Sequence, residues 1–169
     1  MNNSEQLTVL KAKMIGSKFG LICSGAGVLI AQFIMIEMYS SERSFVHAFF
    51  GFMSVSYKLN LLIGVIILLL CGHFYGQIAG RLILIKNYNY ILVGVLTGII
   101  VVLTTAFFCG WTGFFQEGNR SIGAQENPYW DYILKPFFWV TLFGIIPSIF
   151  VGLMLGFLLK LVAVKHKRL

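Results

Sequence analysis

Residues 91–115 read ILVGVLTGIIVVLTTAFFCGWTGFF, a run of 25 amino acids without one charged side chain. The hydrocarbon core of a bilayer is about 30 Å thick, and a helix needs about 20 apolar residues to cross it. The run of valines and isoleucines at Ile99 to Val102 is also compatible with a buried strand in water. In lipid, however, the backbone must satisfy its hydrogen bonds within the segment, which favours a helix. Residues 91–115 therefore predict a transmembrane helix.

Three further apolar runs have a comparable length, at residues 15–38, 61–80 and 137–159. Only 11% of the chain is charged, whereas an ordinary soluble domain is about 25% charged. Segments of about ten residues with alternating polarity, which a transmembrane barrel needs, are absent from the sequence. We therefore predict one all-α domain over residues 1–169, a polytopic membrane protein built as a four-transmembrane-helix bundle. The first run is longer than the core of a signal peptide, so we expect it to be retained as a span.

The connections between the runs differ in character. The first outer loop contains SFVHAFFGFM (residues 44–53), which is too apolar for a free loop and too short to span a bilayer. We interpret it as an interfacial or re-entrant segment of the outer leaflet. The inner connection, residues 81–90, is short and basic. The second outer loop, residues 116–136, is the most polar part of the chain and contains a turn signal at Asn127-Pro128.

The charges predict the orientation of the spans. In a four-span arrangement nine of the thirteen Lys and Arg residues lie on the side of the two termini, and five of the six acidic residues lie on the other side. Cytoplasmic loops carry the excess of Lys and Arg. We therefore expect both termini to be cytoplasmic, in a cell membrane such as a bacterial inner membrane or a plasma membrane. The net charge of +7 then reflects topology and attraction to anionic lipid, and binding to nucleic acid is not expected.

Small residues at four-residue spacing predict how the helices pack. Leucine gains nothing by packing on leucine in lipid, so helices there meet through small residues that allow close approach. Each run offers such a face, beginning with Gly16 and Gly20 in the first. Packing inside one bundle is favoured over a dimer face. The predicted packing positions in the other runs are Gly72, Gly76, Gly80, Gly94, Gly98, Gly152 and Gly156.

Polar residues inside the runs form one candidate site. His73 and Gln77 are four residues apart and share a helix face, and counting from the span ends places Ser24 and Thr97 at a similar depth. The structural interpretation is a packed histidine that bonds one of these two hydroxyls. The functional alternative is a proton path or ligand contact, because ionisable groups in a membrane are costly.

A second candidate site lies at the outer rim, where carboxylates could perform acid–base chemistry. No nucleophile motif accompanies them, so we predict no catalytic residues. No two His, Cys or acidic residues have ligand spacing within one run, so neither a metal nor another cofactor is expected. The single aspartate of the chain excludes a two-aspartate membrane peptidase. The rim residues are Glu37, His47, Glu117, Glu126 and Asp131.

These features leave three functional hypotheses. The first is a non-catalytic subunit or oligomerising component of a membrane transport or envelope assembly, with membrane lipid, other subunits or a second copy of the chain as partners. The second is a small oligomeric transporter or channel with a polar path near His73. The third is an enzyme that acts on a lipid or quinone at the outer leaflet. An enzyme is the less favoured class, because paired catalytic groups are absent from the sequence.

Overall fold

The computed structural model describes residues 3–39, 58–118 and 127–167, and the side chains within 9–34, 61–116 and 127–165. Every element in these ranges is helical, which confirms the predicted all-α class and its four long helices. The apolar segment at residues 44–53 lies outside the described residues. The elements are α1 (Asn3–Tyr39), α3 (Lys58–Leu84), α4 (Tyr90–Gly113), the π-helices η2 (Phe114–Gly118) and η3 (Trp130–Leu134), and α5 (Lys135–Lys167).

All four long helices have the length and composition of membrane spans. Their apolar stretches, Val9–Ile34, Leu61–Leu84, Tyr90–Gln116 and Trp130–Lys165, are each 24 residues or longer, which exceeds the roughly 20 that a bilayer needs. Large apolar side chains cover the outside of the bundle, with Phe150 and Phe74 as examples. Water solvates such a surface poorly and lipid solvates it well. The fold is that of a membrane protein.

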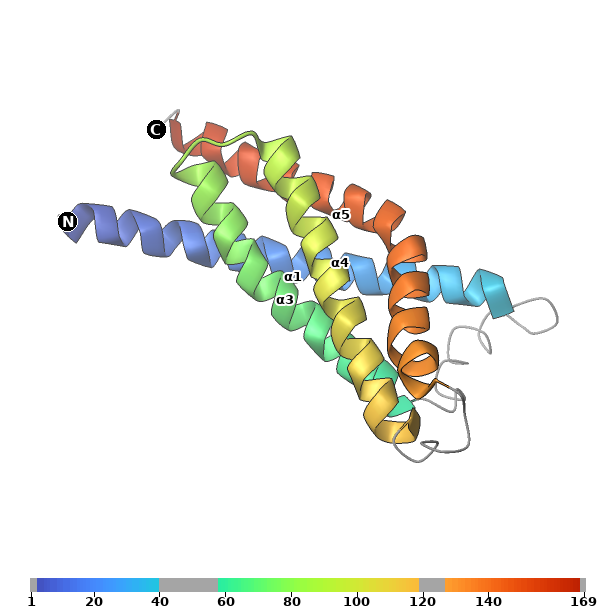
Figure 1. The fold of residues 1–169 in the computed structure, drawn as a ribbon. Helices are drawn as coiled ribbons and strands as arrows, with labels where there is room; N and C mark the ends of the chain where they lie inside the picture. Colours follow the sequence, from blue (N-terminus) through green and yellow to red (C-terminus); the bar gives the residue numbers. More distant parts are fainter. Residues whose placement is uncertain (1–2, 40–57, 119–126, 168–169) are drawn as a thin grey trace.

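The helices run antiparallel in chain order. The start of α1, the end of α5 and the α3–α4 turn lie together at one end of the bundle, which we call the termini end (Figure 1). The opposite end, where α1 ends and α5 begins, is called the loop end. The start of α1 and the end of α5 therefore lie at the same end of the bundle (Figure 1).

The α3–α4 turn occupies residues 85–89, and α3 continues past Gly80 and through Arg81 to Leu84. Arginine is a good helix former, so its charge does not end the helix when it lies at the interface. Asn87 has a φ of 53°, a left-handed conformation that asparagine tolerates well. The side chain of Asn89 then caps α4 by accepting a hydrogen bond from the Ile91 amide at 2.9 Å.

The helix at the loop end begins earlier than the sequence suggests. Residues 116–136 were expected to be a loop, yet Trp130–Leu134 forms a π-helical turn that leads into α5. The side-chain oxygen of Asn127 accepts a hydrogen bond from the Trp130 amide at 3.3 Å, which holds the chain together just before this turn. The Lys135 amide bonds the Trp130 carbonyl, and Pro136, which has no amide hydrogen to donate, follows in the first turn of α5.

Glycines hold α1 against α3. A Cβ atom added at Gly16 would overlap the carbonyl oxygen of Gly76, and one added at Gly20 would overlap that of Gly72. A Cβ at Gly80 would likewise collide with Ala12. The two backbones are therefore in direct contact over three turns. Such contact gives van der Waals and Cα–H···O interactions that replace the missing hydrophobic drive in lipid.

The same arrangement holds α4 against α5. Cβ atoms at Gly94 and Gly152 would each overlap the other residue's carbonyl oxygen, and one at Gly98 would overlap the carbonyl of Ser148. A Cβ at Gly156 would overlap the carbonyl of Tyr90. The bundle thus consists of two tight helix pairs, α1/α3 and α4/α5.

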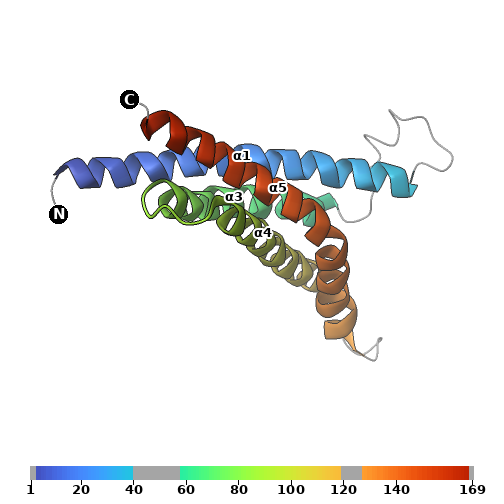
Figure 2. The same ribbon diagram turned by 90° about the horizontal axis from the view of Figure 1, so that it is seen from above.

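The two pairs meet near the termini end and diverge toward the loop end, as Figure 2 shows from above. The first part of α5 is bent relative to the rest of the helix (Figures 1 and 2), and α5 contains Pro147 in its interior. Proline removes one helical hydrogen bond and clashes with the preceding turn, which kinks a helix. The kink carries the start of α5 away from α1.

Candidate functional site

An apolar cavity of about 580 Å³ lies between the two helix pairs. All four long helices line it: α1 from Gly20 to Ile34, α5 from Trp139 to Leu155, and shorter parts of α3 and α4. At 1.5 Å per residue the α5 wall is roughly 24 Å long. None of the described lining residues is charged. The volume is within the range of ligand pockets, about 300–1,000 Å³.

The cavity follows from the helix packing. Glycine contacts fix each pair internally, while the Pro147 kink separates α5 from α1 at the loop end. Small residues leave the space unfilled: Gly27 lines the cavity, and a Cβ added there would meet nothing within 4 Å. Trp139 and Phe143, which stack at 5.7 Å between ring centroids, form the aromatic part of the wall.

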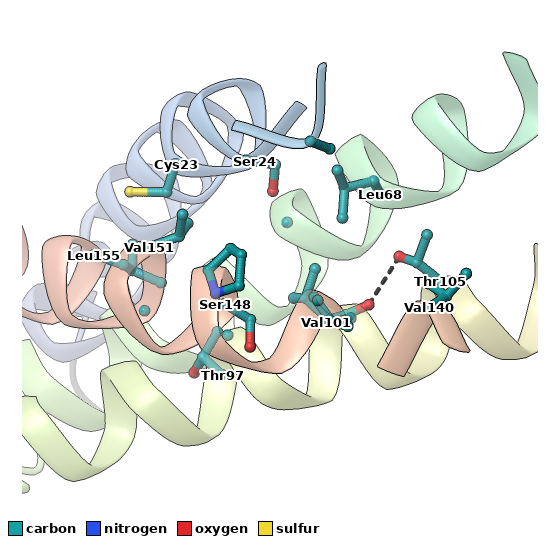
Figure 3. A pocket seen from close by; sticks show the side chains of 18 of the residues that line it. Cys23, Ser24, Leu68, Thr97, Val101, Thr105, Val140, Ser148, Val151 and Leu155 are labelled. Atoms are coloured by element: carbon teal, nitrogen blue, oxygen red, sulfur yellow. Dashed lines mark hydrogen bonds between the residues drawn. The ribbon is translucent and has the colours of Figure 1, made fainter. Parts of the chain in front are cut away.

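Four of the residues that line the otherwise apolar cavity carry hydroxyl groups: Ser24, Thr97, Thr105 and Ser148. Two of them bond carbonyls of their own helix: Thr105 donates to Val101, and Ser148 donates to Ile145, each at 2.8 Å. The Thr105 and Ser24 walls face each other across the cavity (Figure 3).

The other two hydroxyls, on Ser24 and Thr97, make no hydrogen bond within the described part of the chain. The Ser24 hydroxyl lies over Gly72, where an added Cβ would collide with it, and it points from α1 into the space between the helices (Figure 3). Thr97 belongs to the opposite wall, on α4. These two hydroxyls therefore keep unused hydrogen-bonding capacity.

His73 and Gln77 lie outside this cavity, at the α1/α3 contact. The amide nitrogen of Gln77 donates to His73 Nε2 at 2.8 Å, and His73 Nδ1 lies 2.7 Å from Ser17 Oγ. With Nε2 accepting, the proton of a neutral imidazole is on Nδ1, which donates to Ser17. Both ring nitrogens are therefore satisfied by a tether between α1 and α3.

The expected partner of His73 was wrong. Sequence counting placed Ser24 and Thr97 level with His73, but the histidine bonds Ser17. The Ser24 hydroxyl lies against Gly72, the neighbour of His73 in the chain, so its depth is close to that of the histidine. The histidine ring nevertheless bonds Ser17, at another position on α1. Ser17 adjoins Gly16 on the small-residue face, which is the signal that could have identified it.

The predicted polar set is thus divided into two places. Ser24 and Thr97 line the cavity, whereas His73 and Gln77 belong to the interhelical tether. Sequence reasoning missed the cavity as a whole. Two features of the sequence could have indicated the cavity. One is Pro147, and the other is the pair Gly27 and Gly144, glycines that lie away from the contacts within each helix pair.

The outer-rim cluster is represented in the described side chains by Asp131 alone. Its carboxylate lies 3.9 Å from Lys135 Nζ, an i,i+4 pair in which both side chains are substantially exposed to solvent. Such a pair contributes little to stability. His47 and Glu126, and the side chains of Glu37 and Glu117, lie outside the described part.

The termini end carries the positive charge. Seven basic side chains are exposed there, and no described acidic side chain lies among them. Lys160 lies over the ring of Tyr90, 4.1 Å from its centroid, as a cation–π contact. The seven are Lys11, Lys13, Lys18, Arg81, Lys86, Lys160 and Lys165.

No protein-family model matches the chain, and comparison with curated proteins and with solved structures finds nothing similar. The class of the protein therefore rests on its own fold and cavity. It is a polytopic membrane protein with four helices able to span a bilayer. An apolar cavity, uncharged in its described lining, lies between its two glycine-packed helix pairs.

Proposed function

We propose that this chain is a non-catalytic protein of a cell membrane, a bacterial inner or plasma membrane, that binds a long-chain lipid-type molecule in the cavity between α1/α3 and α4/α5. The observation that carries the proposal is the uncharged wall, which extends roughly 24 Å along α5 around about 580 Å³. One leaflet of the hydrocarbon core is about 15 Å deep. The cavity thus suits an extended chain rather than a compact solute.

The orientation of the protein belongs to the same proposal. The seven exposed cations at the termini end support cytoplasmic termini. The part of the cavity that Ile34 and Trp139 line, at the loop end, then lies toward the outer leaflet, and lipid is the molecule available to it there.

The other hypotheses receive less support from the geometry. The glycine faces that suggested an oligomer are occupied within one chain by the α1/α3 and α4/α5 contacts. A polar conduction path near His73 receives less support because both nitrogens of the histidine ring already bond Ser17 and Gln77. Neither nitrogen is left to bind an ion or a substrate. Of the proposed catalytic carboxylates, Asp131 is an exposed partner of Lys135.

Photolabelling tests the binding proposal in lipid nanodiscs, with a fatty acid that carries a diazirine near the end of its chain. Any lipid probe labels an outward residue such as Phe150, which is 66% exposed. Only a probe inside the cavity reaches Leu155, which lines it and is 4% exposed. The ratio of labelling at Leu155 to labelling at Phe150 therefore measures occupancy.

Two glycines of α1 supply matched variants. A side chain at Gly27 enters the cavity, whereas Gly25 does not line it, and a Cβ at either position meets nothing within 4 Å. Gly27→Phe should therefore lower the labelling ratio severalfold, and Gly25→Phe should leave it unchanged. Equal ratios in the two variants and the parent protein, or no label at Leu155, would overturn the proposal.

A further inference from the structure

The residues that line the cavity restrict the polarity of its ligand as well as the ligand's length. A phospholipid headgroup inside the cavity would bury charge without a partner, because no described lining residue is charged and buried charge is costly in a low dielectric. The charged part of a ligand must therefore remain outside. This argument rests on the proposed function, the binding of a long-chain molecule at the same site.

The hydroxyls distinguish an oxygen-bearing chain from a plain hydrocarbon. Ser24 and Thr97 lie within the spans, roughly 15 Å along α1 from Ile34 and roughly 10 Å along α4 from Tyr90. Neither hydroxyl bonds another described residue, whereas Thr105 and Ser148 are satisfied by their own helices. Polar groups removed from water are normally hydrogen-bonded, and an unpaired one lowers stability.

We infer that the cavity binds a long-chain molecule whose inserted part carries an uncharged oxygen, a carbonyl or hydroxyl group, within the hydrocarbon region, and that Ser24, Thr97 or both bond this oxygen. A hydroxyl side chain both donates and accepts, so it serves either type of oxygen. The donors belong to two walls, α1 and α4. The aromatic pair Trp139–Phe143 offers a flat apolar surface beside the chain.

Competition against the diazirine fatty acid tests this inference. The competitors are a long-chain ketone with its carbonyl near mid-chain and the n-alkane of the same carbon number, and the readout is loss of label at Leu155. One hydrogen bond should favour the ketone over the alkane by about 2- to 10-fold in apparent affinity. Ser24→Ala and Thr97→Val each remove one hydroxyl with little change in shape, and one or both should lower this preference.

Thr105→Val is the matched control, because its hydroxyl lines the same cavity but already bonds the Val101 carbonyl. It should leave the ketone preference unchanged. Equal competition by ketone and alkane, or a preference that both Ser24→Ala and Thr97→Val leave intact, overturns the inference while binding itself stands. Failure of the fatty acid to label Leu155 at all instead overturns the proposed function.

Discussion

Replacing Gly20 by alanine should destabilise the protein, whereas the same replacement at Gly25 should not. A methyl group on Gly20 would overlap the carbonyl oxygen of Gly72 and lie 3.0 Å from the Cα of Gly76. Carbon atoms pack at about 3.5–4.0 Å, so α1 and α3 would have to move apart. A methyl group on Gly25 meets nothing within 4 Å.

The pair of variants isolates the cost of this contact. Both gain the higher helix propensity of alanine, worth up to about 1 kcal/mol in water, and this gain cancels in the comparison. Inserting an extra carbon into a packed contact costs about 1–3 kcal/mol. A difference of 1 kcal/mol shifts the unfolding midpoint of a domain of 150–250 residues by about 2–4 °C. Gly20→Ala should therefore unfold about 2–12 °C below Gly25→Ala.

The assay is thermal unfolding of both purified variants and the parent protein in one detergent, followed by helical circular dichroism and tryptophan fluorescence. Gly98→Ala provides a parallel case in the second pair, because its methyl would overlap the carbonyl of Ser148. If Gly20→Ala and Gly25→Ala unfold at the same temperature, backbone contact between α1 and α3 does not stabilise the bundle and the reasoning is wrong.

Three further predictions concern the tether, a buried hydroxyl and the orientation. Ser17→Ala removes the acceptor of His73 Nδ1–H and should lower the unfolding free energy by about 0.6 kcal/mol, the average for hydrogen bonds between membrane helices, and by at most about 1.7 kcal/mol. An unchanged midpoint would contradict the tether. Thr141 Oγ1 is buried without a partner among the described residues. Thr141→Val should therefore keep the unfolding free energy unchanged or raise it, by up to about 1–3 kcal/mol. A clear loss of stability would show that the hydroxyl is bonded. In a variant lacking the three native cysteines, an impermeant maleimide should label Lys135→Cys on intact cells and Lys165→Cys only after lysis, and the reverse pattern would place the termini outside.

The partner of His73 could not be predicted from counted depth. Counting from the ends of the apolar runs gave Ser24 a depth close to that of His73, and the Ser24 hydroxyl does lie against Gly72, the neighbour of the histidine in the chain. Counting gives no direction for a side chain, however. The contacts of Gly16 and Gly20 with Gly76 and Gly72 set how α1 and α3 face each other, and in that arrangement the histidine bonds Ser17.

The sequence by itself determined the class of fold. Uncharged runs such as residues 91–115 must form helices in lipid, because a backbone without water has to bond within its own segment. The glycine spacing also indicated which faces allow close approach. These properties are local, and a linear sequence records them directly.

Only the tertiary structure decided where the empty space lies. The cavity arises because two helix pairs are tight internally and diverge from each other after the Pro147 kink, and divergence is a relation between elements distant in the chain. The same geometry separates Ser24 and Thr97, which line the cavity, from His73 and Gln77, which do not. Local residue patterns specify each helix, but the space between helices depends on all four at once.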